Sequence, residues 1–156
     1  MNSLDTMTPR AVIDTNALLE WLVFRDPAAA SLGRAVEQRA WHWCATAAML
    51  DELRLVLDRP LAERWESARK LALTIDVSGM ALLRTAEPVA PRHALVCRDR
   101  SDQMFIDLAW ACRPCWLVTR DRALLALRRR AAPHGIVVGT PQQWSQHQAA
   151  SMTDAV

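Results

Sequence analysis

One short stretch near the N-terminus constrains the fold more than any other part of the chain. The apolar run Ala11-Val12-Ile13 ends abruptly in Asp14-Thr15-Asn16, and apolar residues at helical spacing begin directly after it. This pattern predicts a buried strand followed at once by a helix, with Asp14 at the junction. In open α/β sheets, ligands bind at the edge where the strands end. Aspartate is also a common helix N-cap, and Asp14 taken alone fits that simpler role.

The same arrangement returns near the other end of the chain. Trp116-Leu117-Val118 predicts a strand, and Asp121 stands between this strand and another helical pattern. Two further strands are predicted over 41–45 and 135–138. Strands that alternate with helices indicate an α/β fold around a mostly parallel sheet. Parallel strands end at the same edge of a sheet, so we expect Asp14 and Asp121 to lie on one edge.

Two more acidic residues are predicted to face the same edge. Glu52 lies beside the apolar stripe of a helix expected after Thr46. Asp102 begins a helix and shares its inward face with Phe105, Ile106 and Ala109. Asp99, in the loop just before this helix, is the alternative to Asp102, but no apolar pattern directs it inward.

The composition is typical of one globular domain. The chain has 156 residues, of which 51% are hydrophobic and 23% are charged. We expect the domain to span 10–148, with short tails at 1–9 and 149–156. A long amphipathic helix is predicted over 67–83, and a last helical turn from Pro141. No apolar run could span a bilayer and no signal-peptide pattern is present, so the sequence predicts a cytoplasmic protein without a membrane segment.

Cysteine spacing offers a different chemistry, which the context disfavours. Cys112 and Cys115 have the spacing of a redox pair or a zinc half-site. A redox pair of this kind opens a helix after a strand, whereas these residues close a helix and lead into a strand. A zinc site would also need a second pair of ligands, and the four histidines are scattered singly. We interpret the pair as a turn flanked by two buried thiols.

The expected cluster of carboxylates needs a compensating charge. Asp14, Glu52, Asp102 and Asp121 would repel one another and raise each other's pKa at one sheet edge. A hard divalent cation such as Mg²⁺ or Mn²⁺ suits an all-oxygen site that lacks His and Cys. Such a metal could hold a phosphodiester and activate water for in-line attack.

The four segments that carry these acids resemble the signature segments of PIN domains. They are Val-Ile-Asp14-Thr-Asn16-Ala-Leu, Met-Leu-Asp-Glu52-Leu-Arg-Leu-Val-Leu, Cys97-Arg-Asp-Arg-Ser-Asp102-Gln-Met-Phe105 and Leu117-Val-Thr-Arg-Asp121-Arg-Ala-Leu-Leu. The resemblance runs from about Arg10 to Trp144 and is closest to the PilT N-terminus-like toxin branch. Each segment alone is a weak signal, whereas all four in order are a strong one.

The resemblance implies a three-layer α/β/α sandwich and a metal-dependent endoribonuclease that leaves 5′-phosphates. It also implies the toxin role in a type II toxin–antitoxin pair, with RNA as substrate and an antitoxin as partner. The metal-binding and catalytic acids would be Asp14, Glu52, Asp102 and Asp121, supported by Asn16 and Thr119. The chain departs from many relatives in two places. Arg120 replaces a glycine before the last acid, and Ala123 and Leu124 stand where another acid often follows.

Arginines flank the acidic residues. Lys70 is the only lysine, so nearly all positive charge is carried by arginine, the better bidentate partner for phosphate. The residues that could form a phosphate track for RNA are Arg98, Arg100, Arg120 and Arg122. The sequence does not decide between this track and ordinary solvated side chains. For the run 128–130 a solvated helix surface is the simpler interpretation.

The chain contains seven tryptophans and no tyrosine. Trp43, Trp110 and Trp116 are predicted to lie in the core. The remaining ones could be partly exposed and mark a surface for a homodimer or an antitoxin: Trp21, Trp41, Trp65 and Trp144. Ordinary packing is the simpler account of each one individually.

Two rival functions remain. One is a PIN-fold module that binds RNA or protein without catalysis, although all four acids are present. The other is an α/β phosphotransfer domain with Asp14 as nucleophile. That chemistry also needs a well-placed lysine, and Lys70 lies in the helix predicted over 67–83.

Overall fold

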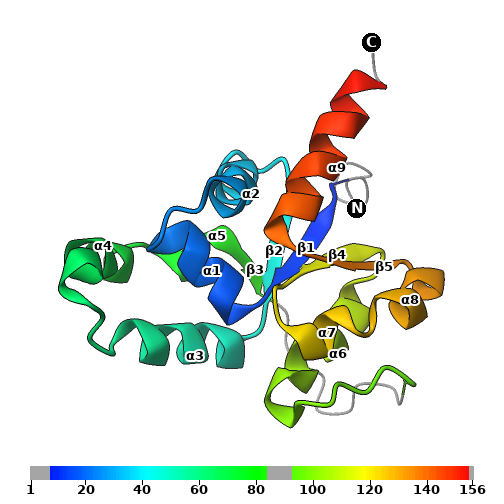
Figure 1. The fold of residues 1–156 in the computed structure, drawn as a ribbon, viewed down its shortest axis with the longest axis horizontal. Coiled ribbons are helices and arrows are strands. Elements are labelled where there is room, and N and C mark those ends of the chain that lie inside the picture. The colour runs from blue at the N-terminus through cyan, green and yellow to red at the C-terminus, as the bar shows by residue number, and fades with distance from the viewer. Residues whose placement is uncertain (1–7, 84–92, 155–156) are drawn as a thin grey trace.

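The computed structural model describes residues 8–83 and 93–154, which contain a five-stranded, fully parallel sheet (Figure 1). The strands lie in the order β3-β2-β1-β4-β5. Their bounds are β1 Arg10–Ile13, β2 His42–Ala45, β3 Ala81–Leu83, β4 Cys115–Val118 and β5 Ile136–Gly139. Ala11 of the central strand pairs with Trp43 on one side and Trp116 on the other.

Helices connect the strands and cover both faces of the sheet. They are α1 Thr15–Leu22, α2 Pro27–Glu37, α3 Ala47–Leu57, α4 Glu63–Leu73, α5 Val77–Met80, α6 Gln103–Cys112, α7 Arg122–Leu125, α8 Arg128–Ala131 and α9 Pro141–Thr153. Short 3₁₀ segments span Arg100–Asp102 and Ala132–His134. Where a strand leads directly into a helix, a polar residue caps that helix: Asp14, Thr46, Asp121 and Thr140.

The alternation of buried side chains along the strands builds two cores. Ala11 and Ile13 of β1 face the core shared with α1, α2, α3 and α9. Val12 points to the opposite face, where the core is completed by α6, α7 and α8. Because successive side chains of a strand point to opposite faces, one short apolar strand serves both layers. The expected α/β/α sandwich with a parallel central sheet is confirmed.

The strand order reverses at the centre of the sheet. The chain proceeds from β1 to β2 and β3 on one side, then crosses back so that β4 and β5 lie on the other side. The carboxyl ends of β1 and β4 are therefore neighbours, but their chains leave toward different layers. In open α/β sheets the region outside such a switch point is the usual ligand site, and we call the region between the carboxyl ends of β1 and β4 the crevice.

The prediction of a long helix over 67–83 is wrong. The chain forms α4, a turn, the short helix α5 and then the edge strand β3. Asp76 caps α5 by accepting the Gly79 N–H at 3.0 Å, and Ala81 pairs with Trp43 of β2. At the other end, α9 continues to Thr153, beyond the expected start of the tail at 149. Residues 1–7 of the expected N-terminal tail lie outside the described part.

The tryptophans mostly follow the simpler expectation of ordinary packing. Trp21, Trp41 and Trp144 are buried, because Trp21 packs edge-on against Trp43 and Trp41 against Trp144, whereas Trp65 is partly exposed. Trp110 is half-exposed instead of a core residue. The expected turn at Cys112 and Cys115 is confirmed, with both side chains buried.

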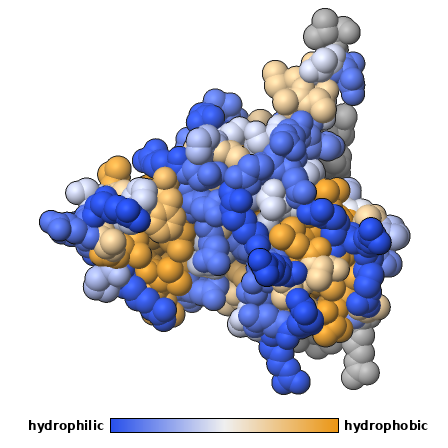
Figure 2. All heavy atoms as spheres, in the orientation of Figure 1, coloured by the Kyte–Doolittle hydropathy of each residue, from blue (hydrophilic) through white to orange (hydrophobic). Residues whose placement is uncertain are grey.

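The surface in the orientation of Figure 1 is divided by polarity. Hydrophilic side chains run down its middle, and apolar side chains gather over α3 and α4 (Figure 2). Exposed leucines on these two helices are Leu55, Leu71 and Leu73. Within 8–83 and 93–154, no helix is long and apolar enough to cross a membrane.

Candidate active site

Asp14 lies at the carboxyl end of β1 and is almost fully buried. Its Oδ1 accepts the Ala17 N–H at 2.8 Å, which caps α1, and its Oδ2 accepts a hydrogen bond from the Thr119 hydroxyl. Burial raises the pKa of the Asp14 carboxyl, and the charges of Asp121 and Glu20 add to the rise; the two hydrogen bonds oppose it. The capping role expected for an aspartate here is real, but it does not explain the neighbouring negative charges.

Thr119 and Asp121 form the matching turn after β4. The buried Thr119 hydroxyl donates to Asp14 and accepts the Asp121 N–H at 2.9 Å. Asp121 in turn caps α7, because its Oδ1 accepts the N–H groups of Ala123 and Leu124 at 2.8 and 3.2 Å. One hydroxyl therefore joins the two strand ends that carry the aspartates.

The structure separates the two candidates near α6. Asp102 is half-buried; burial, followed by the charges of Asp121, Asp99 and Asp14, raises the pKa of Asp102 to about 6. Asp99 is exposed and accepts the Ser101 N–H at 3.0 Å and the Ser101 hydroxyl at 2.6 Å, which lowers its pKa. The Asp102 carboxylate therefore interacts electrostatically with Asp14 and Asp121, whereas the hydrogen bonds of Asp99 stabilise the turn.

Glu52 reaches this group indirectly. Its Oε2 accepts a hydrogen bond of 2.7 Å from the hydroxyl of Thr15, the residue that follows Asp14. Asn16, in the first turn of α1, is exposed. The structure thus brings Asp14, Asp102 and Asp121 into mutual electrostatic contact and places Glu52 at their side through Thr15.

The donor set fits a hard divalent cation. The three aspartates offer only oxygen atoms, and each oxygen of the Asp14 carboxylate keeps a second lone pair beyond its hydrogen bond. Burial, followed by neighbouring carboxylates, raises the pKa values of Asp14 and Asp102, and a bound cation would act in the opposite direction. Among the described residues, no three His, Cys, Asp or Glu side chains are already gathered closely enough to hold an ion. Metal binding would therefore require side-chain movement at this crevice.

The arginines divide into two groups. Arg98 and Arg100, on either side of Asp99, and Arg122, directly after Asp121, are exposed. Arg120 instead forms an ion pair with Glu20, with 2.5 Å between Nε and Oε1.

Of the 128–130 run, Arg128 donates to the Val138 carbonyl of the edge strand β5 at 3.0 Å, and Arg130 donates to the Ala94 carbonyl at 2.5 Å. These last two arginines support the main chain.

Glu20 is the acidic residue near the crevice that sequence reasoning missed. It belongs to α1, and its charge is among those that raise the pKa of Asp14. One signal was available, because Glu20 is the only charged residue between Ala17 and Phe24. A lone carboxylate in an apolar run of this kind needs a cationic partner.

Comparison with protein families agrees with this geometry. A family model described as PIN domain matches residues 10–123, which include β1 to β4. The chain belongs to the PIN domain family. A search of curated proteins found no match to it. The matched part of this PIN domain contains all four predicted acids, and PIN domains are generally nucleases that use divalent metals.

Proposed function

We propose that this PIN domain is a metal-dependent endoribonuclease that hydrolyses RNA phosphodiesters with Mg²⁺ or Mn²⁺. The observation that carries the proposal is the convergence of Asp14, Asp102 and Asp121, from three separate elements, at the switch point of the sheet. Two of these carboxylates have raised pKa values that a bound cation would reverse. Helix capping accounts for the positions of Asp14 and Asp121, but Asp102 makes no capping hydrogen bond and adds a third carboxylate to the group.

Each residue of the group has a distinct task in this proposal. Asp14, Asp102 and Asp121 would hold the cation, and Glu52 would join them from its position beside Thr15. When bound, a divalent cation would supply charge neutralisation and activation of a water molecule. Thr119 keeps Asp14 and the Asp121 main chain in register, so that the two strand ends present their carboxylates together. Asn16 would contribute a polar side chain at the rim.

The RNA strand would be bound through its phosphates. Arg98, Arg100 and Arg122 are exposed at the same edge of the sheet, where they could offset the repulsion between the acidic crevice and a polyanion. Arg120 is less suited to this task, because its guanidinium already pairs with Glu20. Binding by phosphate contacts alone would carry little sequence information.

The decisive experiment is an RNA cleavage assay with purified protein. We expect cleavage that requires Mn²⁺ or Mg²⁺, leaves 5′-phosphates and is lost in Asp14→Asn. Cleavage that persists in Asp14→Asn would assign it to a contaminant or another site. RNA binding without cleavage at any metal concentration would favour the non-catalytic module.

We further propose that the protein acts as the toxin of a type II toxin–antitoxin pair. The support is the resemblance of its four acidic segments to that branch, together with the exposed leucines on α3 and α4 as a surface for an antitoxin or a second copy. Induced expression should arrest bacterial growth with the wild-type chain and not with Asp14→Asn. Light scattering of the purified chain would establish whether a homodimer forms.

A further inference from the structure

Arg120 stands between two residues that build the crevice, but its side chain reaches elsewhere. Thr119 and Asp121 hold the carboxyl ends of β1 and β4 together. The Arg120 Nε lies 2.5 Å from Glu20 Oε1 of α1, and its Nη2 lies 3.6 Å from Asp26 Oδ2, the N-cap of α2. These ion pairs therefore connect the turn after β4 to α1, the helix that Asp14 caps, and to the start of α2.

Glu20 is an unfavourable place for a negative charge. Its side chain is only 20% exposed, and its Oε2 is buried without a hydrogen-bond partner among the described residues. Its charge adds to the repulsion felt by Asp14. Unless a cation balances Glu20, a fourth negative charge would act on the group of Asp14, Asp102 and Asp121.

We propose that Arg120 is a resident counter-cation of the acidic crevice, held by Glu20 and Asp26 until a divalent cation binds. This inference rests on the proposed function, because it assumes that the same carboxylates receive the metal. Arg120 is then a positioning residue: it limits repulsion across the crevice in the metal-free protein and does not contact the RNA.

The role predicts two effects of opposite direction. Loss of the Arg120 charge should destabilise the metal-free protein, because Glu20 is left unpaired beside Asp14. The same loss should tighten metal binding, since one positive charge is removed and one negative charge is freed nearby. An ion pair that only braces the two elements would lower stability and leave metal affinity unchanged or weaker.

The test uses Arg120→Gln, with Arg129→Gln as the matched control on an exposed arginine of α8. Melting temperature would be measured without metal, and the Kd for Mn²⁺ by titration of the full chain. For Arg120→Gln we expect a melting temperature lower by several degrees and a Kd lower by about threefold or more. Arg129→Gln should change neither. Adding Glu20→Gln to Arg120→Gln should return the Kd toward the wild-type value.

A second arm separates this inference from the proposed function. In an Asp14→Asn background, Arg120→Gln should lower the melting temperature by fewer degrees than it does in the wild type, because one of the repelling charges is absent. Equal losses in both backgrounds, or unchanged or weaker Mn²⁺ binding by Arg120→Gln, would overturn the inference. If the wild-type chain binds no Mn²⁺, the proposed function fails, and the comparison of backgrounds alone decides whether Arg120 balances the crevice.

Discussion

Thr119 shows how much of the crevice depends on one hydroxyl group. It is fully buried, donates to Asp14 and accepts the main-chain N–H of Asp121. A threonine at the end of an apolar strand could equally be an ordinary helix cap, and the sequence offers no way to see both partners. The contact with Asp14 spans 105 residues of sequence, so only the folded chain reveals it.

Replacing Thr119 with Val keeps the shape of the side chain and removes the hydroxyl. The Asp121 N–H then loses its acceptor and Asp14 loses a donor, so we expect a loss of about 1–3 kcal/mol in the free energy of unfolding. Nuclease activity should fall as well. Thr119→Ser should retain most of both, as measured by urea denaturation and RNA cleavage. Equal behaviour of the Val and Ser variants would show that the hydroxyl is not the essential group.

Asp102 and Asp99 are expected to respond differently to the same substitution. Asp102→Asn should abolish metal-dependent RNA cleavage, because Asp102 faces Asp121 and Asp14. Asp99→Asn should keep most of the activity, since the Asp99 carboxylate is exposed and accepts its hydrogen bonds from Ser101 in the turn. Single-turnover rates at saturating Mn²⁺ distinguish the two. A larger loss for Asp99→Asn would mean that the ligand has been misassigned.

The raised pKa of Asp102 also predicts how stability changes with pH. Its pKa is about 6 in the folded protein and about 3.9 in an unfolded chain. Between these values the folded state binds more protons, so metal-free stability should rise as the pH falls from 7 toward 4. Melting temperatures across this range test the sign. Asp102→Asn should flatten the profile, and an unchanged profile in that variant would assign the effect to another group, such as Asp14.

Part of the secondary structure could be predicted from the sequence. Strands β1, β2, β4 and β5 were predicted because each is a short apolar or β-branched run bounded by polar or turn residues. Strand β3 was missed, because Ala81–Leu83 has only 3 residues and continues an apolar pattern at helical spacing. Its identity is fixed by pairing with β2, a contact between distant residues. The ion pair between Arg120 and Glu20 could not be predicted from the sequence for the same reason.

The end of α2 offers a test of backbone conformation. Arg39 has a φ of 59°, a left-handed conformation that glycine adopts without strain. The Arg39 N–H donates to Val36 and the Ala40 N–H to Ala35, which is the Schellman pattern of a helix end. Arg39→Gly should therefore raise the free energy of unfolding by about 0.5–1 kcal/mol.

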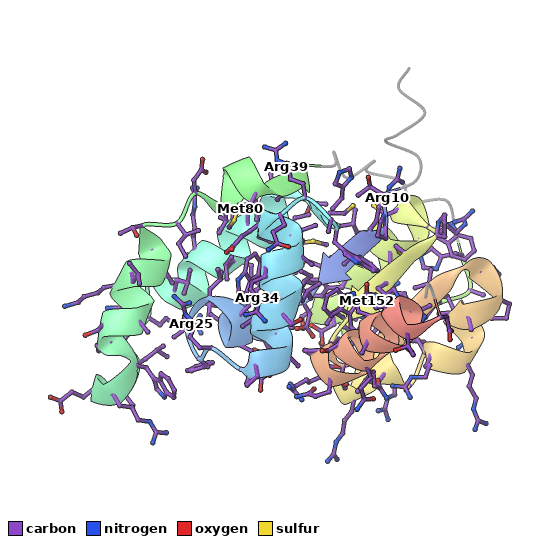
Figure 3. All side chains as sticks on the ribbon, turned by 90° about the horizontal axis from the view of Figure 1, so that it is seen from above. Arg10, Arg25, Arg34, Arg39, Met80 and Met152 are labelled. Carbon is purple, nitrogen blue, oxygen red and sulfur yellow. The ribbon has the colours of Figure 1, made fainter. Side chains whose placement is uncertain are left out.

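Arg34 provides the matched control for this substitution. It is an exposed arginine of the same helix, and both residues are visible along α2 in Figure 3. Arg34→Gly places glycine inside a helix and should lower stability by about 1 kcal/mol. Opposite signs for the two variants in urea denaturation are expected. Destabilisation by both would show that the Arg39 side chain contributes more than its backbone strain costs.

In the molecule as a whole, the C-terminal end of α9 projects beyond the body (Figure 1). The side chains of Ala149–Thr153, the end of α9, are exposed, whereas Trp144 in the first half of α9 is buried. Gln148 accepts a hydrogen bond of 3.3 Å from the Trp41 indole. Within 8–83 and 93–154, no side chain of α9 beyond residue 148 is buried.

A chain that stops after Gln148 should keep its fold. The removed side chains are exposed, so we expect a change in melting temperature of no more than about 3 °C and full nuclease activity. A chain that stops after Thr140 loses Trp144 from the core and should not fold cooperatively. Circular dichroism melts of both truncations provide the comparison. A large loss in the first one would mean that the exposed end of α9 contributes to stability.

The position of β4 beside β1 has a consequence for the protein during its synthesis. Asp14 emerges from the ribosome well before its partners across the crevice, because Thr119 follows 105 residues later and Asp121 comes after Thr119. Pairing between such distant segments forms late, because a long loop must close first. A nascent chain with its first three strands therefore carries one isolated aspartate at a strand end and no crevice. If the chain cleaves RNA as proposed, it has no complete site with which to cleave its own message until the segment around Asp121 has been made.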